Sequence, residues 1–453
     1  MPAGGTWTVQ NKVRPGAYIN FVSVPAVLGT LGDRGTVAVG MPMTWGPQNE
    51  IITLTGAELL SGASLAKVGV TATDTEASLP YRVALAGCYT ALLFRTDVGG
   101  EKATATVSAE TLTVTAKYAG TTGNKITVVT VKDKPAVGSF TIQVLVNNLL
   151  KESFVVTNIS ALAELDSAFV DFQVLKTDAT IPETAGVTLT GGTNGQVNKE
   201  IYPNFWSLLD TKNFQAIAMY DTDVSIAPLL KDKIELWREK RGKKVVAVVY
   251  NNPEADFEGI ISVDQGYKTA NETVDTTLFP IWAASMSAGA QVNESLTATV
   301  VENAVEIINP VLEDKIEDAL NAGRFILTYR QDGAVCVEKD INTLHTFTVD
   351  KNYAFSKNRV MRCLDEIGNS TALVFNRNYA GKVDNDNVGR NQFKTELISM
   401  MDTLVDLRAI QNFDGAKDIT VLPGESVDSV VVDLTVQPVD SMEKLYMTVN
   451  VNA

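Results

Sequence analysis

Apolar and polar residues alternate with a period of two near both ends of the chain, which predicts β-strands there. The N-terminal strand is bounded by Pro15-Gly16 and by Pro25, and no hairpin partner is evident nearby in the sequence. We therefore expect this strand to pair with a distant segment or with another chain. Its residues are Ala17, Tyr18, Ile19, Asn20, Phe21 and Val22.

A second alternating region closes the chain and predicts a β-hairpin with a loop at residues 438–441. Residues 413–426 contain Gly415, Pro423 and Gly424 and indicate a linker between this hairpin and the body. Both ends of the chain are thus predicted to be strand arms. The hairpin residues are Val430, Val431, Val432, Asp433, Leu434, Thr435 and Val436 in the first strand, and Leu445, Met447, Val449 and Val451 on one face of the second.

Threonine-rich alternation over residues 103–195 predicts several short strands separated by turn residues, a pattern typical of a β-sandwich. On either side of this region, helical and strand periodicities are mixed. The sandwich is therefore predicted to be inserted into an α/β domain. Its expected strands lie near 111–118, 126–131, 140–146 and 153–157, with a short helix near 161–169.

The remaining pattern predicts an α/β core. Residues 215–250 indicate a βαβ unit, which should be a parallel pair with a right-handed crossover. Two long helices are expected near 357–375 and 388–407. The predicted fold class is α+β and multidomain, with a mixed α/β core, an inserted β-sandwich, and N- and C-terminal strand arms. The predicted boundaries are 1–28 for the N-terminal arm, 29–102 and 196–412 for the two parts of the core, 103–195 for the sandwich, and 413–453 for the linker and C-terminal arm.

Composition narrows the function classes. The chain of 453 residues is 45% hydrophobic and 20% charged, which is typical of a soluble globular protein with more than one domain. Its formal net charge of -15 repels phosphate backbones, so direct nucleic-acid binding is not expected. No apolar run approaches the roughly 18 residues of a membrane span, and the start of the chain lacks a signal-peptide pattern, so neither membrane insertion nor secretion is expected.

The sequence offers little catalytic chemistry. The three cysteines, Cys88, Cys336 and Cys363, are far apart and are expected to be buried free thiols. His345 is the only histidine, which excludes a multi-histidine metal site, and no GxSxG nucleophile motif accompanies it. The βαβ unit carries Asp221-Thr222-Asp223 where a nucleotide-binding fold has a glycine-rich turn. We expect no catalytic residue, no cofactor and no metal, and hence a protein that is not an enzyme.

The stretches DINTL at 340–344 and KNRVMR at 357–362, with other segments in order along the chain, resemble parts of the sheath proteins of contractile phage tails and related particles. DINTL at 340–344 and KNRVMR at 357–362 resemble the family's DINTLT and KxxRxxR stretches before a long helix, with His345 where the family often has threonine. The other similar segments are 14–21, which looks like the family's RPGxY arm, 35–39 with 45–47, 116–126, which is similar to AKYxGxxGNxI, and the C-terminal strands.

The resemblance implies a structural subunit that polymerises around a tail tube and contracts to drive the tube through a target cell envelope. It implies as partners further copies of the chain, the tail tube protein, and baseplate and tail terminator proteins. The location implied is a virion tail or a phage-tail-like particle such as a bacteriocin, assembled in the bacterial cytoplasm and released by lysis. It also implies that the arm strands join neighbouring subunits, and that Arg390 and Lys394 on the last long helix face the tube.

Two other classes remain open from the sequence. A β-rich surface or adhesin protein would use the inserted sandwich as its binding module, and a signal peptide would favour it. An α/β enzyme would have its site at a sheet edge, and detectable turnover or a bound cofactor would favour that alternative.

Overall fold

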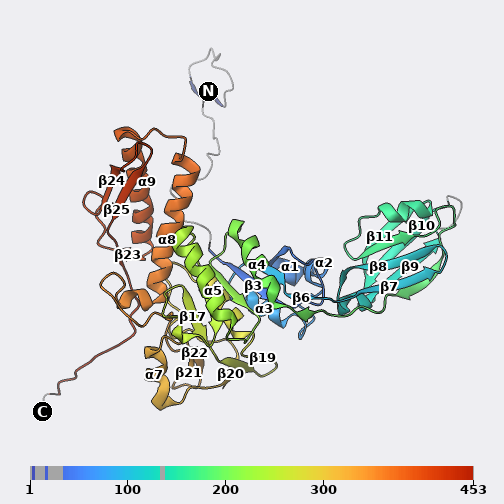
Figure 1. The fold of residues 1–453 in the computed structure, drawn as a ribbon, viewed down its shortest axis with the longest axis horizontal. Coiled ribbons are helices and arrows are strands. Elements are labelled where there is room, and N and C mark those ends of the chain that lie inside the picture. Colours follow the sequence, from blue (N-terminus) through green and yellow to red (C-terminus); the bar gives the residue numbers. More distant parts are fainter. Residues whose placement is uncertain (1–2, 6–15, 19–33, 133–137, 452–453) are drawn as a thin grey trace. The chain divides into compact units, whose positions relative to one another are not determined.

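The computed structural model describes residues 3–5, 16–18, 34–132 and 138–451, with side chains from residue 34 onward. The chain divides into two compact units, which are described separately (Figure 1). The smaller unit comprises Met1–Gly32 and Glu366–Pro438, and the larger comprises Asp33–Asp365 and Val439–Ala453. Within the described ranges, no helix is long and apolar enough to cross a membrane.

A six-stranded sheet with the order β17-β16-β15-β3-β5-β4 forms the centre of the larger unit. Neighbours from β17 to β5 run parallel, and β4 is antiparallel at one edge. β15 and β16 pair in parallel with α5 between them, which confirms the predicted βαβ unit. The strands are β3 (Thr36–Met41), β4 (Ile51–Thr55), β5 (Thr90–Arg95), β15 (Ala216–Met219), β16 (Val246–Tyr250) and β17 (Ile260–Val263).

Successive residues of these strands pack into two separate cores, one on each face of the sheet. Val37 and Val39 of β3 belong to one core, whereas Ala38 between them belongs to the other. The first core contains α6, which is apolar around its whole circumference and buried accordingly. The second contains the apolar sides of α4 and α5. The helices are α3 (Leu79–Ala84), α4 (Tyr202–Leu208), α5 (Ile226–Glu235), which continues as a π-helical turn over Leu236–Lys240, and α6 (Phe279–Gly289).

The inserted domain is a β-sandwich, as predicted from its threonine-rich alternation. A four-stranded sheet, β11-β10-β9-β13, and a three-stranded sheet, β12-β8-β7, enclose one apolar core. A 3₁₀ turn over Ile159–Glu164 replaces the expected short helix. The strands are β7 (Lys102–Ser108), β8 (Leu112–Ala119), β9 (Ile126–Lys132), β10 (Phe140–Val146), β11 (Leu149–Val156), β12 (Val170–Val174) and β13 (Thr184–Thr188).

The two chain crossings into and out of the sandwich pair with each other, as β6 (Asp97–Val98) and β14 (Gln196–Val197). At this junction Arg95 and Asp97 form a buried ion pair with Nη2 and Oδ2 2.7 Å apart. Nη1 of Arg95 also donates to the carbonyl oxygens of Gly46 and Ala119, at 3.0 and 2.8 Å. The junction is therefore an ordered polar contact that joins the α/β core to the sandwich.

Smaller elements complete the larger unit. A three-stranded antiparallel sheet has the order β19-β18-β20, and β21 pairs with β22. Their bounds are β18 (Gly266–Thr269), β19 (Thr273–Val274), β20 (Ala304–Ile308), β21 (Leu327–Tyr329) and β22 (Val335–Val337). The remaining short helices are α1 (Gly56–Ser61), α2 (Ser64–Val68) and α7 (Ile316–Asn321).

Two long helices, α8 (Asn358–Val374) and α9 (Asn387–Asp406), agree with the helices predicted near 357–375 and 388–407. The smaller unit contains the end of α8, a π-helical turn over Phe375–Tyr379, and α9. Its strands are β23 (Ile410–Gln411) with β26 (Gln437–Pro438), and β24 (Ile419–Pro423) with β25 (Val430–Leu434). β1 (Ala3–Gly5) and β2 (Gly16–Tyr18) also belong to it.

Candidate assembly interface

The hairpin β24–β25 carries two strand edges that are unpaired within the described residues. Ile419, at the start of β24, is fully buried in a unit whose core also includes Met400 and Leu404 of α9. Along β25, Val431 is 53% exposed, and its neighbours alternate between half-buried and exposed. A two-stranded sheet with open edges offers backbone N–H and C=O groups to a further strand.

This pairing corrects the C-terminal hairpin predicted from sequence. Val430–Leu434 pairs with Ile419–Pro423, inside the segment that we expected to be a linker. Thr435 and Val436 follow β25 outside any strand, and residues 445–451 form no strand among the described residues. Alternation predicted strand character but not the partner, and Pro423-Gly424 mark the turn side of β24 instead of a flexible joint.

The last described residues form an extended, apolar and exposed segment. We call residues 445–451 the C-terminal tail. The exposed fractions of Leu445, Met447, Val449 and Val451 are 84%, 73%, 69% and 86%. Large exposed apolar side chains spaced along a segment favour contact with another apolar surface. Apolar and polar residues alternate along the tail as they do along a β-strand, but the tail pairs with no strand among the described residues.

Immediately before the tail, the chain is held to the larger unit by charge. Lys357, whose side chain is 3% exposed, forms ion pairs with Glu443 and, at 3.6 Å, with Asp440. The hydroxyl of Thr297 donates to Oε1 of Glu443 at 2.9 Å. We call residues 440–443 the root of the tail, and Lys357 with Thr297 the root site.

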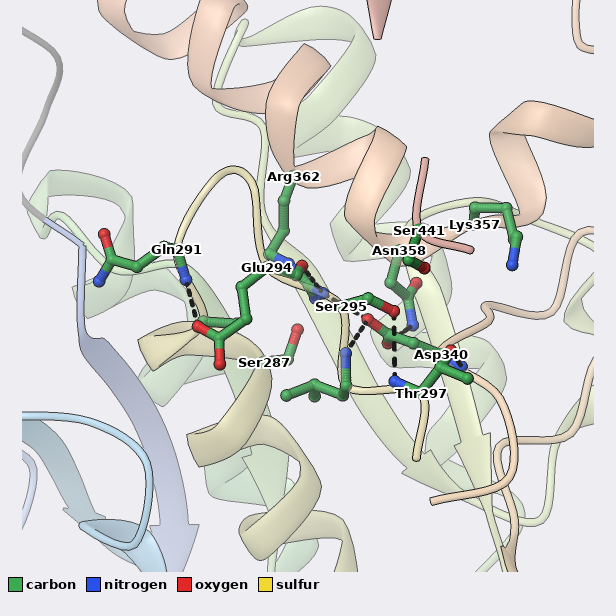
Figure 2. A network of polar contacts seen from close by, with 12 residues as sticks. Ser287, Gln291, Glu294, Ser295, Thr297, Asp340, Lys357, Asn358, Arg362 and Ser441 are labelled. Atoms are coloured by element: carbon green, nitrogen blue, oxygen red, sulfur yellow. Dashed lines mark hydrogen bonds and ion pairs between the residues drawn. The ribbon is translucent and has the colours of Figure 1, made fainter. Parts of the chain in front are cut away.

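The root site rests on a buried polar network centred on Asp340 (Figure 2). The Asp340 carboxylate accepts hydrogen bonds from the backbone N–H of Leu296 and from Nδ2 of Asn358, each at 2.9 Å, and pairs with Arg362. Its backbone N–H donates to the Thr297 hydroxyl at 3.0 Å, and this orients the hydroxyl proton toward Glu443. Arg362 also donates to the carbonyl of Glu294 at 3.0 Å.

The network joins the two most distinctive stretches of the sequence, DINTL at 340–344 and KNRVMR at 357–362. Their spacing gave no indication that Asp340, Asn358 and Arg362 meet, nor that Lys357 receives Glu443 from 86 residues further along the chain. A signal was present, since a lysine, an asparagine and an arginine opening a helix behind an aspartate suggest ion pairs. It could not identify the partners.

The two cations proposed to face a tube lie near the start of α9. Nη1 of Arg390 donates to the carbonyl and the side-chain oxygen of Asn385 at 2.8 and 2.9 Å, and Nη2 donates to Asn387 at 2.6 Å. Arg390 therefore ties the preceding loop to the helix. Lys394 is half-buried one turn further on.

In the N-terminal strand, Ala17 and Tyr18 belong to β2, which pairs in parallel with Ala3–Gly5. The expectation that this strand has no local partner is therefore wrong for Gly16–Tyr18. Residues 19–22, Ile19 to Val22, lie outside the described residues. Whether either strand joins another subunit stays a prediction.

Candidate chemical groups are engaged in ordinary structural contacts. Nδ1 of His345 contacts the carbonyl of Thr343 at 2.9 Å, and its backbone N–H donates to Asp256. Cys88, Cys336 and Cys363 are buried, as predicted, and form no disulfide among the described residues. Burial raises the pKa of the Cys88 and Cys336 thiols, which disfavours the reactive thiolate. In the part of the chain that the structure describes, no group of three or more potential ligands could hold a metal ion.

An α/β body with an inserted β-sandwich, a separate helical unit with an open-edged hairpin, and an exposed apolar tail define a multidomain assembly subunit. Models of three phage tail sheath domains match the chain: the β-sandwich domain at residues 98–194, the central domain at 195–343 and the C-terminal domain at 350–452. The chain belongs to the phage tail sheath protein family, which confirms the resemblance seen in its sequence, and it is therefore a structural sheath subunit.

Relatives and solved structures agree with this assignment. The chain is 33% identical to the phage-like element PBSX protein XkdK of Bacillus subtilis, covering 99% of this chain and all of that protein. The sheath tail protein of Desulfitobacterium hafniense is 35% identical, with a TM-score of 0.79 over 95% of this chain and 99% of that chain. The anti-feeding prophage helical sheath in its contracted state shares the fold at 10% identity, with a TM-score of 0.55 over 98% of this chain and 99% of that one.

Proposed function

We propose that this sheath subunit polymerises around a tail tube, and that the polymer contracts to drive the tube through a target cell envelope. The observation that supports this most directly is an apolar tail at 445–451 without a sheet, in the same chain as a hairpin with open edges. Each subunit thus carries both a strand to donate and an edge to receive one. The contracted sheath whose fold the chain shares is consistent with this proposal.

Strand donation between copies would explain why the apolar side chains of the tail are exposed in a single chain. Pairing with a neighbouring edge satisfies backbone N–H and C=O groups and buries alternate apolar side chains. A donor–acceptor contact joins two different surfaces, so it propagates into rings or an open helical array instead of closing as a dimer. The polymer therefore needs no ligand or cofactor to grow.

The proposed partners are other copies of the chain, the tail tube protein, and baseplate and tail terminator proteins. The proposed location is a virion tail or a phage-tail-like particle, assembled in the bacterial cytoplasm and released by lysis. We propose no catalytic activity, no cofactor, no membrane insertion and no direct nucleic-acid contact, the last because the net charge is -15.

A truncation tests the proposal. A chain that ends at Lys444 keeps β25, β26 and the root at 440–443, and loses only the exposed tail. It should melt like the full chain but fail to form tubes visible by electron microscopy at concentrations where the full chain assembles. A matched variant that replaces Leu445, Met447 and Val449 by serine keeps the length and should show the same defect. Normal tubes from both variants would refute tail donation.

The N-terminal strand is proposed to join the C-terminal region of another subunit and to remain paired during contraction. Cysteines placed one in residues 17–22 and one in residues 430–436, on a background without Cys88, Cys336 and Cys363, should crosslink as a ladder between subunits. The ladder should form in extended and in contracted particles. Crosslinks confined to single chains would contradict this arrangement.

The proposal that Arg390 and Lys394 of α9 face the tube is best tested by reversing one charge. Because Arg390 holds the loop at 385–387, Arg390→Glu would disturb the helix start whether or not a tube is present. Lys394→Glu is the informative change, and it should weaken co-assembly with tube protein without lowering the melting temperature. Equal co-assembly of wild type and Lys394→Glu would reject a tube-facing role.

A further inference from the structure

We propose that the root site clamps residues 440–443 to the body of its own subunit, so that the C-terminal tail emerges at a fixed point with Lys444 as its pivot. The clamp itself is a contact within one chain. Its meaning for assembly rests on the proposed function, in which the tail is donated to a second copy.

The root site is a receptor for carboxylates. Lys357 is almost fully buried, and the ion pairs given to it by the described residues come from Glu443 and Asp440. An ammonium group taken out of water is costly unless opposite charge accompanies it. Removal of the root would leave the Lys357 charge uncompensated, so residues 440–443 act as a part of the body.

The receptor is prepared by the network beneath it. The backbone N–H of Asp340 donates to the Thr297 hydroxyl, which leaves the hydroxyl proton available for Glu443. The Asp340 carboxylate is held in turn by Leu296 and Asn358. Figure 2 shows Thr297 and Asn358 beside Asp340, with Ser441 of the root next to Asn358 and the Lys357 side chain directed away from Asp340. The geometry for binding Glu443 is therefore set by residues with their own buried partners.

The clamp ends abruptly. Glu443 is half-buried and paired, whereas Lys444 and the residues after it are exposed. Because a residue spans at most about 3.3–3.6 Å, the Cα of Leu445 lies within roughly 7 Å of the Cα of Glu443. Lys444 is therefore the one residue between the clamped root and the alternating segment. A neighbour's strand edge must therefore come to the root site of the donor.

This short connection also limits the change in direction that a donated tail can make relative to its own body. Residues 413–426 contain β24 and so offer less freedom than a linker. With the root clamped, a change in the angle between donor and acceptor has to be taken up at Lys444.

Proteolysis of the purified full-length chain tests the clamp without any polymer. Trypsin cleaves after Lys444 only when the flanking residues enter its active site in extended form. Glu443→Gln keeps the size of the side chain but removes the charge, and it should raise the rate of cleavage after Lys444 at least tenfold. Lys357→Met should do the same from the other side of the pair. The double variant should be cleaved no faster than Lys357→Met alone, because Lys357→Met already removes the ion pair that Glu443→Gln breaks.

Glu425→Gln is the matched control, since Glu425 is exposed and lies outside the root, and it should leave the cleavage rate unchanged. Unchanged cleavage in Glu443→Gln would overturn the clamp, as would fully additive effects in the double variant. If Lys357→Met does not fold, Glu443→Gln still decides, because its substitution lies on the segment and not in the buried site.

The assembly readout is separate. Loosening the root makes donation costlier in entropy, so the concentration of Glu443→Gln needed for tube formation should rise about tenfold. An unchanged concentration would refute the role of the clamp in donation, even where cleavage confirms the clamp. Failure of the proposed function has another signature, which is normal tubes from the chain that ends at Lys444.

Discussion

Replacement of Asp340 by asparagine is a direct test of the network beneath the root site. Asp340 is 2% exposed, and its carboxylate accepts hydrogen bonds from Leu296 and Asn358 and pairs with Arg362. The amide keeps the shape but removes the charge that compensates Arg362. It also presents an NH₂ group to surroundings that supply only donors.

The expected loss follows from burial. Breaking a buried ion pair by removing one partner costs about 3–5 kcal/mol, and the oxygen that asparagine retains places this variant near 3 kcal/mol. For a domain of this size that loss corresponds to a decrease in melting temperature on the order of 8 °C. Melting of the purified full-length chain, followed by scanning calorimetry, measures it.

Glu306→Gln is the matched control, because it makes the same chemical change in an exposed pair. Lys268 and Glu306 are 2.7 Å apart, and their side chains are 43% and 55% exposed. Such surface pairs contribute about 0–1 kcal/mol, so the melting temperature should shift by at most about 3 °C. If Asp340→Asn melts together with Glu306→Gln, the network does not stabilise the body and the reasoning is wrong.

Three further predictions concern the rest of the larger unit. Burial alone would raise the pKa of Asp210, but the hydrogen bond from Trp237 and the contacts with Arg241 and Lys233 lower it to about 2. The stability that Asp210 contributes is therefore complete above about pH 4 and is lost as the pH falls toward 2. In urea unfolding, Asp210→Asn should reduce the loss of stability between pH 4 and pH 2, and an unchanged loss would contradict this prediction. Trp45 is fully buried in the sandwich core, and its indole N–H donates to the carbonyl of Ala66 at 3.0 Å. Trp45→Ala should lower the free energy of unfolding by about 3–5 kcal/mol. A decrease under 1 kcal/mol in denaturant unfolding would show that the junction does not depend on Trp45. Deletion of residues 103–195 exposes Trp45 and Leu65, so the shortened chain should form tubes only when these two residues are also made polar. If the polar variant still forms no tubes, the sandwich contributes a contact between subunits.

Elements with strong periodicity could be predicted from the sequence. The helices at 358–374 and 387–406, the βαβ unit and the sandwich all appear where the pattern indicated them. Each depends on local alternation or on helical spacing, which a single segment carries by itself. The class of fold follows from their order along the chain.

Pairing between distant segments could not be predicted in the same way. β25 had two apolar segments to pair with, and alternation does not distinguish Ile419–Pro423 from residues 445–451. The link from Lys357 to Glu443 is a contact between single charged residues in a chain with 53 acidic side chains. Such contacts depend on how the tertiary fold brings the segments together, so only the structure identified the root site.

The position of the root determines which residues of the subunit first bear a force applied to the tail. In the proposed assembly, a neighbour that pulls on residues 445–451 pulls first on Glu443, and through it on Lys357, which directly precedes the first residue of α8. The force therefore reaches a 17-residue helix and the Asp340 network before it can act on the short pairing of β26 with β23. The hairpin β24–β25 lies further back along the chain than the root, so under the proposed donation of the tail a pull on the tail reaches the root first and the hairpin later.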